Sequence, residues 1–211
     1  MSKTTRERLL DAGLQMLLER GYNAMGIQDL LAETGTPKGS FYHHFGSKEA
    51  FALEVVDRYM EEVHRGLDQT LANPDRAPLD RVRDFFELSA EKYRGEGNLG
   101  CLLGGLGQEL SGINDRFRLK IEQCLAAIAE RFVVCFDAAQ ARGDVPPQAD
   151  SRALAERLLD CWEGAALRSR LRRDRAPLID MLDFYFAQVA IAGGGGGMIS
   201  DGVSSASLTQ K

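Results

Sequence analysis

Thr36-Pro37-Lys38-Gly39-Ser40-Phe41-Tyr42-His43-His44-Phe45-Gly46-Ser47-Lys48-Glu49 is the stretch that decides the fold. Thr followed by Pro is typical of a helix N-cap and first helical position, so we expect Thr36 and Pro37 to start a short helix. Phe41 and Phe45 are spaced to anchor one face of that helix to a core. The polar residues between them would then face outward, as in a helix that enters the major groove of DNA.

Two further helical patterns precede this stretch. Apolar residues recur at the spacing of one helix face in residues 10–17, with Gly21 as the expected stop, and again in residues 27–31, ending near Gly35. Helix, helix, turn and helix within fifty residues is the helix-turn-helix arrangement. We therefore predict that residues 1–49 form a helix-turn-helix DNA-binding domain.

The rest of the sequence also has helical periodicity, and no segment alternates as a strand would. The expected helices cover residues 48–72, 79–93, 101–110, 114–141, 150–171 and 176–191. We predict an all-α fold in which residues 50–192 form a helical ligand-binding and dimerisation domain. Residues 193–211 are rich in Gly and Ser and are predicted to be a disordered tail.

Composition limits the class of protein. The chain has 211 residues and a formal net charge of -5, and no apolar run approaches the roughly 20 residues that span a bilayer. We expect a soluble, cytoplasmic protein that makes no membrane contact. Residues 1–50 hold as many basic as acidic side chains, so DNA binding would depend on how the charges are arranged. The four Cys and three His show no zinc-like spacing, and we predict neither a metal nor a cofactor.

Several motifs together resemble the TetR family of transcriptional regulators over residues 3–191. They are Gly21-Tyr22-Asn23-Ala24, Asp29-Leu30-Leu31, residues 37–45 and Ser47-Lys48-Glu49. A second block, residues 100–110 with Trp162-Glu163-Gly164-Ala165, is similar to the electrophile-responsive repressors typified by the N-ethylmaleimide and acrylate regulators. The resemblance implies a homodimer that binds a palindromic operator and leaves it when a small-molecule inducer binds.

Two positions depart from the pattern of the family. Met25-Gly26 stands near the start of the second helix, where many relatives carry Thr or Ser, so a phosphate contact there would come from a backbone N–H. Arg170 stands where relatives of the subgroup often have Lys. A guanidinium stays protonated, so it cannot act as an amine nucleophile towards a modified cysteine.

The DNA-contacting residues are predicted from the geometry of a recognition helix. Its N-terminal side chains reach base edges and its neighbours fix phosphates. The candidates are Lys38 and Ser40 for bases, Gly39 for close approach, and Thr36, Tyr42, His43 and Lys48 for phosphates, with Gln28 reaching in from the second helix. The alternative is an ordinary solvated face. A metal site at His43-His44 is not expected, because adjacent helical positions do not converge.

Cys101 is the candidate sensor. It lies in a glycine-rich break beside a predicted helix start, where the helix dipole favours the thiolate form. The alternative is a buried, inert cysteine. The other predicted pocket residues are Phe85, Tyr93, Gln108, Glu109 and Trp162, with Arg168 or Arg170 pairing a ligand carboxylate such as acrylate. The basic residues near position 170 could instead only complement a helix C-terminus.

The last two predicted helices carry apolar stripes that suggest a dimer interface. The candidates are Leu154, Leu158, Ala165, Leu178, Leu182, Tyr185 and Phe186. In TetR-like dimers such helices form half of an intermolecular four-helix bundle. The alternative is that these faces complete the core of a single chain.

Three functions follow as hypotheses. The first is a homodimeric repressor released from its operator by a reactive electrophile or small carboxylate, through modification of Cys101 and a shift of the fourth helix. The second is a repressor of the same fold that responds to a non-covalent, multidrug-type ligand. The third, a cysteine-dependent enzyme, needs a base near Cys101. All three His lie within residues 43–64, so we predict that the protein is not an enzyme.

Overall fold

The chain is helical throughout the part that the structure describes. A computed structural model describes residues 3–97 and 99–190, so the predicted tail 193–211 lies outside the described residues. The helices are α1 (Thr5–Ala24), α2 (Ile27–Thr34), α3 (Lys38–Phe45), α4 (Lys48–Leu71), α5 (Pro78–Gly95), α6 (Leu102–Leu110), α7 (Asp115–Arg142), α8 (Ser151–Arg172) and α9 (Ala176–Val189). No strand occurs in these residues, which confirms the all-α prediction. None of these helices is long and apolar enough to cross a membrane.

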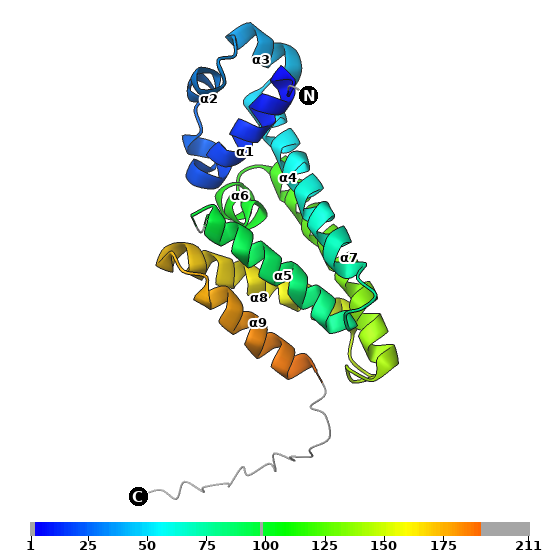
Figure 1. Ribbon diagram of the computed structural model, residues 1–211. Helices are drawn as coiled ribbons and strands as arrows, with labels where there is room; N and C mark the ends of the chain where they lie inside the picture. Colours follow the sequence, from blue (N-terminus) through cyan, green and yellow to red (C-terminus); the bar gives the residue numbers. More distant parts are fainter. Residues whose placement is uncertain (1–2, 98, 191–211) are drawn as a thin grey trace, which may run out of the picture.

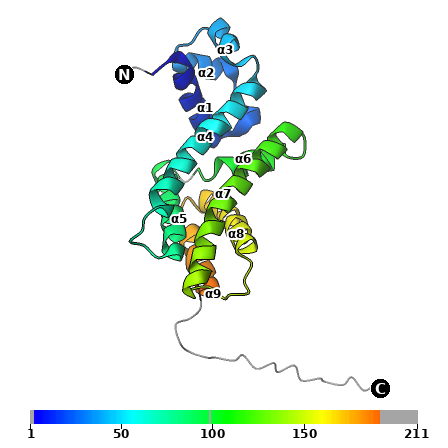
Figure 2. The ribbon, with the colours of Figure 1, turned by 90° about the vertical axis from the view of Figure 1, so that its right-hand side faces the viewer.

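The helices form two groups that α4 joins. Figure 1 shows α1, α2 and α3 gathered at one end, with α4 running from them into a body made by the later helices. Helix α6 lies where the two groups meet, and it packs against α1, α4 and α7 (Figure 2). The first three helices therefore pack mainly against α4 and α6.

Side chains fix several helix starts by binding the free amides of the first turn. Thr4 and Glu7 form a capping box at α1: the Glu7 amide donates to Thr4 Oγ1 at 3.2 Å and the Thr4 amide to Glu7 Oε2 at 2.7 Å. Ser47 accepts from the Ala50 amide at 3.0 Å, as predicted for α4. Asn114 caps α7 in the same way.

Two predicted helix boundaries are wrong. Gly21 does not end α1 but kinks it, with φ 76° and ψ 177°, and the helix continues to Ala24. Thr36 does not cap α3, because Pro37 takes the N-cap position and α3 begins at Lys38. The Thr36 amide instead donates to Leu31 O at 3.0 Å and closes the end of α2 beyond the left-handed Gly35.

The aromatic anchors of α3 are buried, as predicted. Phe41 and Phe45 lie in the core, and both rings contact the ring of Phe51 from α4, with centroids 5.2 and 4.8 Å away. Phe51 also lies against Gly13 of α1, where any side chain would collide with the ring. These contacts bind α1, α3 and α4 into one small core, so the polar face of α3 is directed outward.

Candidate functional site

The outer face of α3 presents most of the predicted DNA-contacting residues. Lys38, Gly39, Tyr42 and His43 are exposed, and so is Gln28 on α2; Ser40 is half-buried. Thr36 is only 6% exposed, which does not favour a phosphate contact by its side chain, and that contact stays a prediction. The low exposure arises because Thr36 closes the end of α2 and is turned into the core.

Two positions beside this face are held by local contacts. The ammonium group of Lys48 lies 4.5 Å from the ring centroid of Tyr22, a cation–π contact that fixes its position at the start of α4. Gly26 is the N-cap of α2 and has no side chain to bind the first-turn amides. A phosphate contact by one of these amides stays a prediction, and the Asp29 carboxylate lies beside Gly26.

A cavity of about 510 Å³ opens among α4, α5, α7 and α8. Its wall includes the aromatic side chains of Tyr59, Phe85, Phe86, Tyr93 and Trp162, together with Cys101 at the N-cap of α6. The structure therefore brings together four predicted pocket residues: Cys101, Phe85, Tyr93 and Trp162. A cavity of this size, mostly apolar with a few polar groups, fits a small organic molecule.

Polar side chains from α4 and α8 lie beside the Cys101 thiol. Tyr59 Oη from α4 lies 3.6 Å from Cys101 Sγ, and Glu163 from α8 faces the thiol. Desolvation, together with the negative charge of Glu163, raises the pKa of the thiol from 9.0 to about 12. The predicted resting thiolate is therefore wrong: these effects outweigh the helix N-terminus, and Cys101 is protonated at neutral pH.

The other predicted pocket residues lie elsewhere. Gln108 and Arg170 line a smaller cavity of about 270 Å³, which Cys101 also borders. Arg168 is exposed and lines neither cavity. Glu109 at the far end of α6 binds α1 instead of a cavity. Sequence reasoning missed Tyr59, and it missed Glu163 although this residue stands in the motif beside Trp162.

Glu109 and Arg170 make what we call the α6–α1 junction. The Glu109 carboxylate accepts the amides of Tyr22 and Asn23 at 2.7 and 2.6 Å, just after the kink at Gly21. Arg170 donates to Leu99 O at 3.3 Å and to Glu19 O of α1 at 3.4 Å. The helix that starts at Cys101 therefore ends on the backbone of α1, in the group formed by the first three helices.

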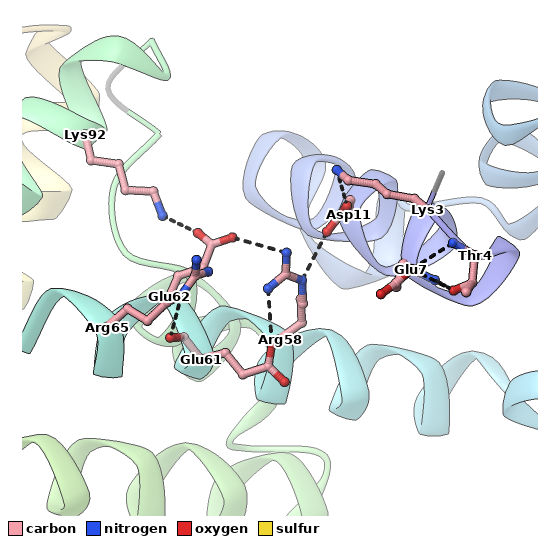
Figure 3. Close-up of polar contacts among 9 residues, drawn as sticks. All are labelled: Lys3, Thr4, Glu7, Asp11, Arg58, Glu61, Glu62, Arg65 and Lys92. Atoms are coloured by element: carbon pink, nitrogen blue, oxygen red, sulfur yellow. Dashed lines mark hydrogen bonds and ion pairs between the residues drawn. The ribbon is translucent and has the colours of Figure 1, made fainter. Parts of the chain in front are cut away.

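A chain of ion pairs also joins the larger cavity to α1 (Figure 3). Lys92 of α5 binds Glu62 of α4 at 2.6 Å, and Glu62 lies 4.0 Å from Arg58. Arg58 in turn binds Asp11 of α1 at 3.1 Å, and Asp11 also binds Lys3. Both Lys92 and Glu62 line the cavity. Each pair is partly exposed and contributes at most about 1 kcal/mol to stability by itself. The main effect of this series of ion pairs is therefore to link the cavity wall to α1.

Two family models cover most of the chain. Residues 9–55 match the N-terminal model described as bacterial regulatory proteins of the tetR family, and residues 78–184 match the tetracyclin repressor-like C-terminal domain. The chain belongs to the TetR family of transcriptional regulators. Its outward-facing α3 is thus the second helix of the helix-turn-helix of a DNA-binding repressor.

Individual relatives agree with this assignment. The chain is 34% identical to the transcriptional repressor DhaR of Mycobacterium sp. (strain GP1), over 88% of this chain and 93% of that protein. It is 38% identical to the transcriptional regulator AcuR of Cereibacter sphaeroides, over 82% and 79% of the two chains. These relatives are regulators, in line with the prediction that the protein is not an enzyme.

Solved TetR-family structures share the fold. A regulatory protein TetR from Rhodobacter sphaeroides superposes with a TM-score of 0.85 at 35% identity, covering 89% of this chain and all of that one. The reduced form of Escherichia coli NemR gives 0.80 at 27% identity, covering 89% of this chain and 97% of that one. The two-group arrangement around α4 is therefore that of known family members.

The predicted dimer residues are mostly internal to the TetR-family chain. Leu158, Leu178 and Leu182 are fully buried within it, so they pack in its own core, and their part in a dimer interface stays a prediction. Tyr185 donates its hydroxyl to Leu154 O at 2.6 Å, which joins α9 to α8. Ala165 and Phe186 are also buried. The large apolar side chains left exposed on these two helices are Leu167, Leu171 and Phe184.

Proposed function

We propose that the protein is a homodimeric repressor that leaves a palindromic operator when a reactive electrophile modifies Cys101. The observation that carries this proposal is the position of Cys101: it stands at the N-cap position of α6 in the wall of the larger cavity, and the same helix ends at the α6–α1 junction. The similarity to NemR, of which a reduced form is known, supports a thiol as the sensor.

The operator contacts follow from the exposed face of α3. Lys38 and Ser40 would reach base edges, with Gly39 allowing close approach, while Gln28, Tyr42, His43 and Lys48 would bind phosphates. Replacing Lys38 with Ala should weaken operator binding by about 1–3 kcal/mol per half-site. Fluorescence anisotropy with operator DNA measures this. His64→Ala is a control on α4, far from the α3 face in sequence, and equal binding by Lys38→Ala and wild type would contradict the assignment.

The second copy would cover the exposed apolar side chains of α8 and α9. Leu171 is 67% and Phe184 70% exposed, and Leu167 lies one turn before Leu171. Two recognition helices on one two-fold axis match two operator half-sites, which one short helix cannot achieve. Sedimentation of wild type and Phe184→Arg tests this: the variant should shift towards monomer.

Release would be transmitted through α6 as well as α4. An adduct on Cys101 enlarges the side chain at the start of α6, and the α6–α1 junction converts movement of α6 into movement of α1. The ion-pair chain from Lys92 to Asp11 gives a second connection, along α4. An effector changes operator affinity only as far as it binds the two states differently.

The deciding experiment measures operator affinity before and after treatment with N-ethylmaleimide. Wild type should lose affinity by roughly 5–150-fold, the usual range of allosteric coupling. Cys101→Ser should not respond. Cys161→Ser is the matched control, because Cys161 is an exposed thiol of the same chain, and it should respond as wild type does. An unchanged response in Cys101→Ser would refute the thiol switch.

A second candidate is release by a non-covalent ligand of the same cavity. The protonated thiol and the aromatic wall favour it, because both suit an apolar molecule that binds without reacting. In that case a saturating ligand would release wild type and Cys101→Ser equally. Mass spectrometry would then find no adduct.

A further inference from the structure

Glu163 is a partly buried acidic side chain to which the proposed function assigns no role. It lines both cavities together with Cys101. None of the described Lys or Arg residues forms an ion pair with it, and it faces the thiol of Cys101. Its Oε2 atom lies so close to α6 that a Cβ atom on Gly104 would be 2.0 Å away. Glycine at position 104 therefore lets the carboxylate reach the first turn of the helix that Cys101 caps.

We propose that Glu163 is the proton acceptor through which Cys101 reacts with α,β-unsaturated electrophiles. The proposal rests on the covalent form of the proposed function. As sulfur attacks the carbon β to the carbonyl group, the C–S bond forms and the π bond breaks. The thiol proton moves to the Glu163 carboxylate and from there to the α-carbon, so the product is a neutral thioether.

The reaction needs such an acceptor because the resting thiol is neutral. A thiol is a weak nucleophile, and burial together with the charge of Glu163 raises the pKa of Cys101 to about 12. Burial also raises the pKa of Glu163, which makes its carboxylate a stronger base than one in water. A carboxylate that disfavours the free thiolate can thus still assist transfer of the proton as the bond forms.

The other titratable or charged groups around the thiol are less suited to accept its proton. Burial holds the pKa of Tyr59 on α4 and of Tyr93 on α5 well above the ordinary value, so both phenols stay protonated. Glu62 is engaged by Lys92 at 2.6 Å. Arg170, in the smaller cavity, is a cation and donates to two backbone carbonyls. Glu163 is the carboxylate that remains.

The test compares wild type and Glu163→Gln in the rate at which N-ethylmaleimide labels Cys101. Peptide mass spectrometry resolves the sites, and labelling of Cys161, which is exposed, serves as the internal reference for reagent and pH. Loss of a proton acceptor slows a reaction by about 100-fold or more. Gln also removes the charge that opposes the thiolate, and this raises the rate and offsets part of the loss. We therefore expect the labelling rate to fall about tenfold near neutral pH.

The sign of the change separates the two roles of Glu163. A purely electrostatic neighbour would make Glu163→Gln react faster than wild type, because the thiolate would form more easily. An equal or faster rate therefore overturns the proposal. The pH profile gives a second readout: the wild-type rate should level off once Glu163 is ionised, whereas the variant rate should keep rising with pH towards the pKa of the thiol.

Two controls keep the result interpretable. Tyr59→Phe removes the hydroxyl 3.6 Å from the sulfur without removing the acceptor and should slow labelling less than Glu163→Gln does. Operator binding by unmodified Glu163→Gln reports an intact fold. If wild type is labelled at Cys101 and leaves DNA while Glu163→Gln reacts as fast, only this inference fails. If Cys101 of wild type is never labelled, the covalent form of the function fails with it.

Discussion

Replacing Glu109 with Ala should loosen the hold of α6 on α1. The substitution removes an acceptor for two backbone amides, those of Tyr22 at 2.7 Å and Asn23 at 2.6 Å. Hydrogen bonds to a charged group are worth about 1.5–3 kcal/mol each. The Asn23 amide is exposed and can bind water once the carboxylate is gone, whereas the Tyr22 amide is partly buried. We therefore expect a loss of about 2 kcal/mol rather than the full sum.

Thermal unfolding measures this change. For a chain of this length 1 kcal/mol corresponds to about 2–4 °C, so Tm should fall by roughly 4–8 °C at equal protein concentration. Glu109→Gln keeps a carbonyl acceptor and should lose about half as much. Gln108→Ala, at the exposed neighbouring position, is the matched control and should unfold as wild type does. If the Tm of Glu109→Ala equals that of wild type, the proposed role of the α6–α1 junction is refuted.

Three further predictions concern packing, capping and pH. Gly13→Ala should destabilise the protein by about 1–3 kcal/mol, because its Cβ would lie 2.3 Å from Cζ of the fully buried Phe51. Urea unfolding checks this, and an unchanged midpoint would contradict the close packing. Asn114→Ala should cost about 1 kcal/mol in the same assay by leaving two first-turn amides of α7 uncapped, while Asn114→Ser should retain the cap. Burial raises the pKa of Glu163 above 4.5, so its favourable contribution to folding is complete below that pH and is lost as pH rises through the folded pKa. Glu163→Gln should therefore be more stable than wild type near neutral pH, and this difference should vanish on acidification below about pH 4.5; a constant difference would be the contrary result.

The helices were largely predictable because their signals are local. Apolar spacing and side chains such as Ser47 at a helix start act within a few residues of sequence. The buried ring positions of Phe41 and Phe45 follow from the same spacing. The prediction for Gly21 is wrong because a glycine can either end a helix or kink it. The prediction for Thr36 is wrong because the end of α2 and the start of α3 share the same few residues, and Thr36 belongs to the end of α2.

The polar groups of the sensor region were predicted less well because their partners are distant in the chain. Tyr59 Oη and Cys101 Sγ meet across 42 positions, and Glu109 binds Tyr22 across 87. Arg170 illustrates the difficulty: sequence suggested a ligand carboxylate, and the structure gives it backbone carbonyls of Leu99 and Glu19. Periodicity indicates which face of a helix is buried, but not which element covers it.

The sequence by itself determined an all-helical TetR-family chain with an outward-facing α3, since helix starts, apolar stripes and the residue 37–45 motif are read within single segments. Only the tertiary structure decided the state of Cys101. The helix start at Cys101 favours a thiolate, yet desolvation among α4, α5 and α8 and the charge of Glu163 raise its pKa to about 12. These effects depend on groups that meet only when the helices pack, because electrostatic interactions act over distance in space and not along the chain.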